Sequence, residues 1–330
     1  MKRIRALVTG GAGFIGSHLV DELIRLGHQV VVIDNLSTGR IENLSTVSSA
    51  IEIVEADLAN KSDWERYFEG IDWVFHLAAL ADIVPSIQNP DAYFSSNVNG
   101  TYNVLRAAQK AKVKRLIYIA SSSCYGIPDQ FPTPETDHLK PQYPYALTKF
   151  LGEELVLHWA DVYGLPALSL RFFNVYGPRS RTSGTYGAVF GVFLAQKLAE
   201  KPFTVVGDGE QTRDFTYVSD IVDALVTAAQ SDRTSRVYNV GSGATVSVNR
   251  LVELLGGDKV HIPKRPGEPD CTFADISRIQ TELGWQPKVS IEEGIANLLN
   301  NINYWREAPV WTPDSIAVAT KDWFRYLGDS

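Results

Sequence analysis

The first half of the chain alternates short apolar runs with longer segments whose apolar residues recur at helical spacing. The near-continuous Val, Ile and Leu content of the short runs is typical of parallel strands that are covered on both faces. Repeated strand–helix units predict an α/β fold built on a doubly wound parallel sheet. The predicted strands are 4–8, 29–33, 51–55, 73–77, 115–120 and 167–171, and the predicted helices are 15–27, 61–70, 92–111 and 144–163.

The pattern becomes less regular after about residue 174. Gly, Pro, Arg, Ser and Thr crowd residues 177–187, and this composition predicts a loop. Short strands, glycine turns and short helices then follow one another and indicate a smaller α/β lobe. The short helices are predicted at 248–255, 277–283 and 291–300.

These changes predict a chain that crosses between two lobes. We expect a first lobe of residues 1–173, to which 214–240 returns, and a second lobe made of 174–213 and 241–330. The second lobe should close over the carboxyl edge of the sheet and bind the substrate. Residues 305–330 hold three of the seven tryptophans, so we expect this tail to be folded.

Composition and charge exclude several classes of protein. With 45% hydrophobic and 21% charged residues, the chain is typical of globular proteins. The net charge of −7 disfavours binding to nucleic acid or to an anionic membrane surface, but allows a local basic pocket for a phosphate group. No stretch reaches the roughly 18–20 apolar residues of a membrane span.

The cysteines and histidines point the same way. The two cysteines lie far apart in the sequence, which argues against a disulfide framework and is typical of a reducing compartment. The six histidines are scattered without metal-ligand spacing, so we predict no metal site. Since no secretory leader precedes the first strand either, we expect a soluble cytoplasmic protein.

A glycine motif follows the first predicted strand and opens the first helix. Gly10, Gly13 and Gly16 have the spacing that lets a tight turn bring the backbone close to a pyrophosphate at a helix N-terminus. Asp34 ends the second strand, where a carboxylate accepts both ribose hydroxyls and repels a 2′-phosphate. The sequence therefore predicts a Rossmann-type NAD site rather than an NADP site.

Further candidate cofactor residues lie at the same edge of the sheet. Small residues after the fourth strand would let the cofactor approach the backbone, and the segment after Asp34 would wrap the adenosine. The predicted contacts are Gly10, Gly13, Phe14, Ile15, Gly16, Asp34, Asn35, Ser37, Thr38, Gly39, Asp57, Leu58, Leu77, Ala78 and Ala79.

The helical segment at 144–163 begins with a candidate catalytic pair. Tyr145 and Lys149 are four residues apart and share one helical face. A nearby ammonium and the charge of oxidised nicotinamide would lower the tyrosine pKa from about 10, so that it serves as a base. The same spacing is also common for a packed ring beside a solvated charge. The serines at 121–123 end the fifth strand and reach the same edge of the sheet.

Together these motifs resemble the extended short-chain dehydrogenase/reductase family. Within it, the chain is most similar to nucleotide-sugar 4-epimerases of the UDP-glucose and UDP-N-acetylglucosamine type. The resemblance covers nearly the whole chain. It rests on the glycine motif, the serine run before Tyr125-Gly126, Tyr145-x-x-x-Lys149, and the segments that begin at Asn97, Arg171, Gly207 and Arg265.

The resemblance implies epimerisation at C4 of a UDP-hexose through a transient 4-keto sugar. Tyr145 would take the proton of the 4-hydroxyl while a hydride passes from C4 to tightly held NAD. Ser121 would hydrogen-bond the same oxygen, with Ser122 as a helper. Lys149 would hold the nicotinamide ribose, and Asn97 would contact the cofactor close to that lysine.

The serine turn favours epimerisation over other outcomes of the same intermediate. Dehydratases of the family carry an Asp-Glu pair after the serine, and decarboxylases usually carry a glutamate there, whereas this chain has Ser122 and Ser123. The alternatives are another epimerase (including a UDP-glucuronate 4-epimerase), a dehydratase, a decarboxylase, or a non-catalytic NAD-binding protein. The intact tyrosine, lysine and serine count against the last of these.

The resemblance also implies a nucleotide-sugar site. Arg213 and Arg265 would clamp the diphosphate, with Asn174 helping and Glu268 on the nucleotide ribose. Taken singly, each arginine is equally well read as part of a surface ion pair or a solvated turn. The other predicted substrate contacts are Asp82, Ser121, Ser122, Ser123, Ala188, Val189, Thr204, Val206 and Thr272.

Thr272 carries the expectation about the sugar. In related 4-epimerases a bulky tyrosine, three residues before the aspartate of an Ala-Asp pair, narrows the pocket and excludes N-acetyl groups. Counting back from Ala274-Asp275 places Thr272 at that position. We therefore expect the UDP-GlcNAc/UDP-GalNAc pair to be accepted, together with the unacetylated pair.

Other polar residues near these motifs are predicted to be structural. We expect His76 to be a satisfied core residue and Cys124 to be a packing residue rather than a nucleophile. Arg179 and Arg181 are expected to lie in a solvated loop.

Family resemblance further implies a homodimer. Members usually pair through two helices of each subunit, here near 92–111 and 144–163. Both segments carry apolar residues beyond one face, for example Val104, Leu151 and Leu155.

Overall fold

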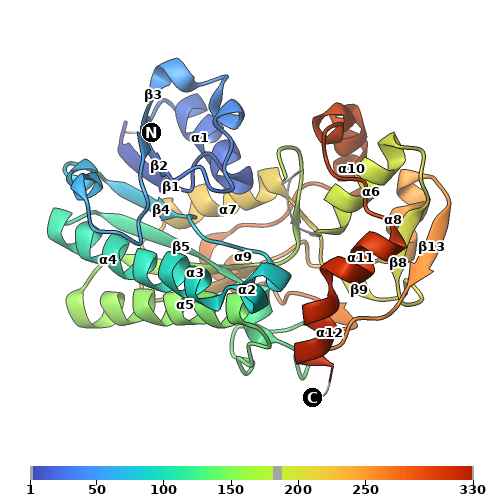
Figure 1. The fold of residues 1–330 in the computed structure, drawn as a ribbon. Coiled ribbons are helices and arrows are strands. Elements are labelled where there is room, and N and C mark those ends of the chain that lie inside the picture. The colour runs from blue at the N-terminus through green and yellow to red at the C-terminus, as the bar shows by residue number, and fades with distance from the viewer. Residues whose placement is uncertain (1–2, 181–187, 329–330) are drawn as a thin grey trace.

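A seven-stranded parallel sheet forms the centre of one lobe (Figure 1). The computed structural model describes residues 3–180 and 188–328. In sheet order the strands are β11 (Val237–Val240), β6 (Ala167–Phe172), β5 (Arg115–Ser121), β4 (Trp73–His76), β1 (Arg5–Thr9), β2 (Gln29–Asp34) and β3 (Ile51–Glu55). The predicted doubly wound α/β fold is confirmed, and the six predicted strands match to within one residue at each end.

Helices cover both faces of this sheet. On one face lie α1 (Phe14–Arg25) and α7 (Val218–Gln230), and on the other lie α4 (Gly100–Ala111) and α5 (Pro144–Tyr163). In β5, Ile117 and Ile119 pack into the first core while Leu116 and Tyr118 pack into the second. Because alternate residues enter two different cores, such a strand is apolar throughout.

Two predicted helices differ from the structure. The segment predicted at 61–70 is a shorter 3-10 helix, Asp63–Phe68, which ends before Gly70 at φ +72°. The segment predicted at 92–111 begins earlier, with α3 (Pro90–Tyr93), and passes through a π-helical stretch, Phe94–Asn99, before it becomes α4.

The π-helical stretch lies between two parts of one continuous helical segment that contact different neighbours. Before it, the Tyr93 ring meets the Tyr145 ring edge-on, with ring centres 6.4 Å apart. After it, the Thr101 hydroxyl bonds the buried His76 ring at 2.9 Å. Within it, Asn97 reaches the backbone of Leu80 beyond the end of β4.

The second lobe contains three small sheets and a third core. Its sheets pair β7 (Val175–Tyr176) with β10 (Thr216–Tyr217), β8 (Phe203–Val206) with β13 (Lys259–Ile262), and β9 (Thr212–Arg213) with β12 (Val246–Ser247) and β14 (Cys271–Thr272). Its helices are α6 (Val189–Leu198), α8 (Val248–Leu255), α10 (Ile291–Asn300), α11 (Pro313–Ala319) and α12 (Lys321–Leu327).

The tail is folded, as predicted. Trp305 is fully buried in the third core, and Trp323 is 5% exposed. The short helix α2 (Ile83–Gln88) of the first lobe lies against α12. No helix within 3–180 and 188–328 is long and apolar enough to cross a membrane.

Some of the chain beyond residue 240 packs on the first lobe. Helix α9 (Ser277–Leu283) lies against β11, and Ile276, Ile279 and Trp285 join the core on the α1 side of the sheet. The sequence pattern had placed all of 241–330 in the second lobe, because a short amphipathic helix does not reveal which apolar surface it covers.

Candidate active site

A cavity along the carboxyl edge of the sheet is built around the glycine motif. Gly10 has φ +69°, and a Cβ there would lie 2.7 Å from the backbone nitrogen of Ala78 on the neighbouring strand connection. A Cβ on Gly16 would collide with the carbonyl oxygen of Gly10. The glycines therefore allow a turn that larger residues would block, and the first residues of α1 line the cavity. This arrangement suits a pyrophosphate at a helix N-terminus.

Asp34 also lines this cavity, which we call the glycine-loop cavity, and two backbone donors fix its side chain. Its carboxylate accepts hydrogen bonds from the backbone of Ala12 at 3.0 Å and of Leu36 at 2.8 Å. Burial raises the pKa of the carboxyl group, and these two donors oppose that shift. The carboxylate is thus fixed where a ribose diol would lie, so the residues present fit NAD.

Most of the predicted cofactor residues line the glycine-loop cavity, and the exceptions are Asn97, Tyr145 and Lys149. All fifteen positions named above from Gly10 to Ala79 line it. Asn97 is 1% exposed, and its amide bonds the backbone N–H and C=O of Leu80 and the Thr148 hydroxyl at 2.8–3.0 Å. These bonds give Asn97 a structural role, and its contact with the cofactor stays a prediction.

A second cavity, which we call the tyrosine cavity, adjoins the first at Phe14, Leu77 and Ala79. It is lined by the predicted catalytic residues and by every predicted substrate residue from both lobes. These are Asp82, Ser121, Ser122, Ser123, Tyr145, Lys149, Asn174, Ala188, Val189, Thr204, Val206, Arg213, Arg265, Glu268 and Thr272.

The pKa of Tyr145 is raised in this structure, whereas its spacing to Lys149 predicts a lowered pKa. Burial raises the pKa of the phenol to about 12, a hydrogen bond with Ser121 opposes the shift, and Lys149 does not contribute. The Lys149 ammonium instead lies over the Tyr118 ring, 4.4 Å from its centre. In the protein alone the phenol is thus favoured over the phenolate, and a positive charge close to the ring would lower this pKa.

Lys149 is 4% exposed. Burial lowers the pKa of its ammonium to about 8, while Cys124 and Glu153 oppose the shift. The Tyr118 hydroxyl donates to the Lys149 carbonyl oxygen at 3.2 Å, which fixes this turn of α5 against β5. Lys149 therefore lines the tyrosine cavity with a pKa of about 8, close to neutral pH, and its role in binding a ribose hydroxyl stays a prediction.

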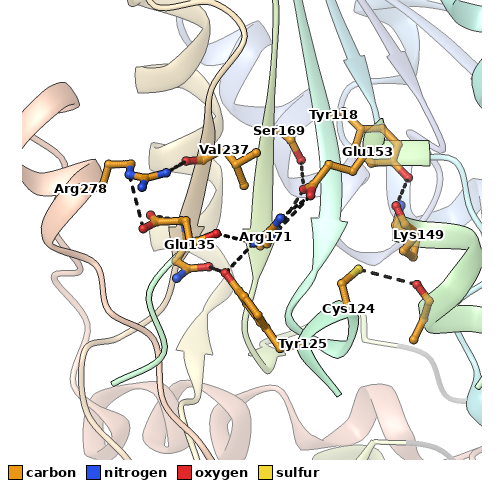
Figure 2. Close-up of polar contacts among 12 residues, drawn as sticks. Tyr118, Cys124, Tyr125, Glu135, Lys149, Glu153, Ser169, Arg171, Val237 and Arg278 are labelled. Atoms are coloured by element: carbon orange, nitrogen blue, oxygen red, sulfur yellow. Dashed lines mark hydrogen bonds and ion pairs between the residues drawn. The ribbon is translucent and has the colours of Figure 1, made fainter. Parts of the chain in front are cut away.

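Behind the cavity, Glu153 and Arg171 form a buried ion pair (Figure 2). Glu153 lies one turn after Lys149 on α5, is fully buried, and meets Arg171 Nη2 at 2.5 Å. Glu153 also accepts a hydrogen bond from Ser169 at 2.7 Å. Although burial by itself would lower the pKa of Arg171, Glu153 raises it. The ion pair ties α5 to β6.

The same arginine reaches the serine turn. Arg171 Nη1 donates to the Tyr125 hydroxyl at 2.8 Å, and that hydroxyl donates to Asn239 Oδ1 at 2.7 Å (Figure 2). Tyr125 ends the 3-10 helix Ser122–Tyr125, which carries the candidate serines. One buried network, outside the cavity itself, therefore sets the positions of α5, β6, the serine turn and β11.

On the opposite wall, a carboxylate lies between the two predicted diphosphate arginines. Glu268 Oε1 accepts from Arg213 Nη2 at 2.9 Å, and its other oxygen lies 3.7 Å from Arg265 Nη1. All three side chains are 11–23% exposed and line the cavity. This cluster differs from a solvated turn or a simple surface pair, because its two cations converge on one carboxylate.

Thr272 also lies on this wall. Its hydroxyl accepts from Asn174 Nδ2 at 2.7 Å, and the same amide nitrogen donates to the Asp214 carbonyl oxygen at 3.3 Å. Thr272 belongs to β14, which pairs with the strand that carries Arg213. The residue predicted to select the sugar is thus held beside Arg213, one of the two predicted diphosphate ligands.

The residues expected to be structural behave in different ways. His76 bonds Thr9 at 2.7 Å and Thr101 at 2.9 Å, and burial lowers its pKa to about 3. Burial raises the pKa of the Cys124 thiol to about 12, which suits a packing residue.

Arg179 lies in a turn, as expected, but its side chain is less solvated than predicted. Its guanidinium pairs with Asp21 at 2.7 Å, and the residue lines the glycine-loop cavity instead of a solvated loop. Arg181 and the rest of 181–187 lie outside the described residues. Within the described part of the chain, no cluster of His, Cys, Asp and Glu could hold a metal ion.

Several aromatic residues that line the two cavities were not predicted from the sequence, among them two in each cavity that lie close to candidate site residues or to the tail. Tyr304 and Trp311 line the glycine-loop cavity, and Arg40 lies over the Tyr304 ring, 5.7 Å from its centre. Tyr143 and Trp323 line the tyrosine cavity. The aromatic content of the tail was the one signal, and it did not identify the partners.

Several known proteins are similar to this chain in sequence. A profile of the NAD dependent epimerase/dehydratase family matches residues 6–241. A UDP-glucose 4-epimerase from Mycolicibacterium smegmatis is 37% identical over 304 residues, which cover 89% of this chain and 96% of that protein. A UDP-N-acetyl-alpha-D-glucosaminuronate decarboxylase from Bacillus cytotoxicus is 33% identical over 320 residues, which cover 92% of this chain and 98% of that protein.

A solved structure has a similar fold over most of the chain. The UDP-N-acetylglucosamine 4-epimerase from Methanobrevibacter ruminantium M1, in complex with UDP-N-acetylmuramic acid, superimposes with a TM-score of 0.86. The two sequences are 34% identical, and the match covers 91% of this chain and 100% of the other. Relatives at this level of identity thus include both epimerases and a decarboxylase.

Proposed function

Since the chain belongs to the NAD-dependent epimerase/dehydratase family, we propose that it is a UDP-hexose 4-epimerase. One observation carries the proposal: a single cavity beside the NAD site brings together Tyr145, Ser121 and the two arginines on Glu268. The cavity thus combines a proton-transfer group with a diphosphate-binding wall. An NAD-binding protein without catalysis needs no such combination.

The chain's residues divide the proton and positioning work. The Tyr145 phenolate takes the proton of the sugar 4-hydroxyl, and the same Oη returns it when the ketone is reduced again. Ser121 donates to the sugar oxygen, and the Ser123 hydroxyl, which bonds Ser121 Oγ at 2.9 Å, keeps Ser121 in place. Hydride acceptance and return at C4 are the chemistry that bound NAD supplies.

The diphosphate wall holds the other end of the substrate. Arg213 and Arg265 turn from Glu268 to the phosphate oxygens, because a diphosphate carries more negative charge than one carboxylate. Glu268 then accepts from the hydroxyls of the nucleotide ribose. Asn174, anchored on Thr272, helps to bind the diphosphate.

A decarboxylase is the second candidate, favoured by the relative from B. cytotoxicus. Removal of a carboxylate or of water from the sugar needs a group that transfers a proton at the carbon next to the ketone. The turn after Ser121 offers the hydroxyls of Ser122 and Ser123, which are poor acids and bases, and both line the cavity. This supports epimerisation.

Thr272 supports an N-acetylated sugar. A threonine leaves more room in the cavity than a tyrosine, so a substituent on C2 of the sugar fits beside it. We infer that UDP-GlcNAc and UDP-GalNAc are interconverted, together with UDP-glucose and UDP-galactose.

The direct test is incubation of the protein with each of these sugars and with UDP-glucuronate, followed by NMR of the products. A 4-epimer with no net NADH is the expected result. A pentose product from UDP-glucuronate would establish the decarboxylase, and a 4-keto-6-deoxy product would establish a dehydratase.

The sugar assignment has its own test. Thr272→Tyr should abolish turnover of UDP-GlcNAc and largely spare UDP-glucose, whereas Thr272→Ser keeps the hydroxyl and serves as the matched control. Equal losses of both substrates in the tyrosine variant would show that Thr272 does not select the sugar.

We also propose a homodimer through α4 and α5, which pack side by side. Tyr102, Leu147 and Tyr163 on these helices are 41–51% exposed, so a partner subunit would cover apolar surface there. Val104 was expected on this outer side but is fully buried in the core beneath. Sedimentation at micromolar concentration should give a dimer, and a monomer alone would contradict the proposal.

A further inference from the structure

Helix α12 lies against α2 of the first lobe (Figure 1), and it contributes to the wall of the tyrosine cavity. One residue of this helix, Trp323, lines the cavity and is 5% exposed. None of the residues to which the proposed reaction assigns a role lies in α12. A large aromatic side chain from a distant part of the sequence is therefore built into the substrate cavity without an explained task.

Contacts on both lobes fix α12 in place. On the first lobe, Gln88 of α2 donates to Asp322 Oδ2 at 2.8 Å. On the second lobe, the Trp323 indole N–H donates to the Pro266 carbonyl oxygen at 2.8 Å. Since Pro266 directly follows Arg265, the indole is fixed to the turn that presents a diphosphate arginine.

The indole ring also lies directly against that arginine. The Arg265 guanidinium carbon lies over the Trp323 ring, 5.3 Å from its centre, which is within cation–π range. The opposite constraint is the Glu268 carboxylate, 3.7 Å from Arg265 Nη1. The guanidinium thus has an aromatic support on one side and a carboxylate on another, while its side chain is only 13% exposed.

We propose that Trp323 is a positioning residue that holds Arg265 in the orientation needed to bind a nucleoside diphosphate. The inference rests on the proposed nucleotide-sugar site and extends it to the tail. An arginine side chain loses much rotational freedom when it is immobilised on a ligand, so a support that orders it beforehand strengthens binding. The indole supplies this support through its face and through its bond to Pro266.

Trp323 also contacts Tyr143, which in turn packs on Tyr145. The Tyr143 ring lies 6.5 Å from the Trp323 ring and is stacked on the Tyr145 ring at 6.3 Å. A role through Tyr143 would change turnover, whereas a role through Arg265 changes the binding of the diphosphate. Binding and turnover therefore have to be measured separately.

The first experiment measures binding of UDP by calorimetry to the full-length holoprotein and its variants. Trp323→Leu removes the ring, and we expect UDP to bind about tenfold more weakly, in line with a cation–π contact at a largely desolvated site. Trp323→Phe keeps a ring but loses the indole N–H, so about threefold weaker binding is expected. Phe324→Leu, on the exposed side of the same helix, is the matched control and should bind UDP like the wild type.

A double-mutant cycle shows whether Trp323 acts through Arg265. In an Arg265→Ala background, Trp323→Leu should weaken UDP binding by less than twofold, because the group that it positions is already absent. Retained NAD, measured after denaturation of each purified variant, should stay at the wild-type level, and kcat should change less than KM.

The outcomes separate this inference from the proposed function. A wild-type protein that binds no UDP would overturn the proposed function and this inference with it. Wild-type binding of UDP that is unchanged by Trp323→Leu would overturn the inference alone. So would a tenfold loss that persists in the Arg265→Ala background, or equal losses in the Leu and Phe variants accompanied by loss of NAD, since both indicate a general structural role.

Discussion

Two arginine–glutamate pairs, one behind the tyrosine cavity and one in its wall, are built differently. Arg171 and Glu153 are 5% and 0% exposed, and Ser169 and Tyr125 add neutral hydrogen bonds to them. Arg213 and Glu268 are 11% and 23% exposed, and the carboxylate is shared with Arg265. The first pair has every partner within the protein, whereas the second can exchange its carboxylate for a ligand.

The difference shows how charge is used in this molecule. Buried charges are stable in a protein when their hydrogen-bonding capacity is satisfied internally, as it is around Glu153. The cations of the Glu268 cluster lie on a cavity wall and remain accessible to phosphate oxygens. Groups behind the cavity should therefore determine stability, and groups that line it should determine binding and turnover.

The largest effect is expected for the reacting group itself. Tyr145→Phe removes one hydroxyl of a residue that lines the cavity, so turnover should fall by about 10²–10⁴-fold. The free energy of unfolding, measured by urea denaturation, should stay close to that of the wild type. Retained turnover, or a large loss of stability, would place Tyr145 among the structural groups instead.

The two arginines give the most direct test of the difference. Arg171→Met leaves the Glu153 charge buried without its partner, and it should reduce the free energy of unfolding by about 3–5 kcal/mol. Arg213→Met leaves Glu268 with Arg265 near solvent, so a loss of about 1 kcal/mol or less is expected. Urea denaturation of both variants checks the contrast, and losses of similar size would remove it.

Asp34 extends the contrast to the glycine-loop cavity. Asp34→Ala removes a charged hydrogen-bond acceptor, so NAD should bind about tenfold to a hundredfold more weakly, while NADP binding improves. Fluorescence titration with each cofactor measures this. Glu55→Ala is the matched control, because Glu55 pairs with Asp34 in the sheet register but is exposed. This variant should bind both cofactors like the wild type. An unchanged cofactor preference in Asp34→Ala would contradict the assignment.

The smallest effect concerns pH and Lys149. Its folded-state pKa, lowered to about 8 by burial, lies below the usual lysine value of 10.5, so the unfolded chain binds the proton more tightly than the folded chain. The stability penalty from this group is therefore full below pH 8 and declines as the pH rises toward 10.5. Between pH 7 and pH 9, the wild type should gain about 1 kcal/mol over Lys149→Met in free energy of unfolding.

That measurement compares urea denaturation of the two proteins at both pH values. A constant difference between them would mean that the lysine keeps an ordinary pKa in the folded protein. Because the raised pKa of Tyr145 affects stability only above about pH 10, it does not enter this range.

The parts of the site that the sequence predicted are those in which neighbours along the chain act together. The glycine motif, Asp34 at a strand end, and Tyr145 with Lys149 on one helical face all depend on short spacing. The carboxyl ends of parallel strands meet at one edge, so strand prediction alone places them close together. The fold class and the residues lining the glycine-loop cavity followed from these local patterns.

The parts that were missed depend on distant partners. Trp323 bonds a carbonyl 57 positions away, and Asp322 bonds Gln88 across 234 positions. Glu153 has the sequence appearance of an ordinary helix charge, and only the folded structure shows that it is fully buried against Arg171. The hydrogen bonds of Asn97 with Leu80 and Thr148 are likewise not predictable from its motif, because Thr148 lies 51 positions away.

The π-helical stretch Phe94–Asn99 makes this part of the chain sensitive to insertions and deletions. Loss of one residue would turn everything after it by about 100° relative to what precedes it. Tyr93 would keep its place at Tyr145, but Thr101 would swing away from His76. Among natural variants of this protein, length differences should therefore accumulate in the loops and be absent from residues 90–111, even where individual side chains change.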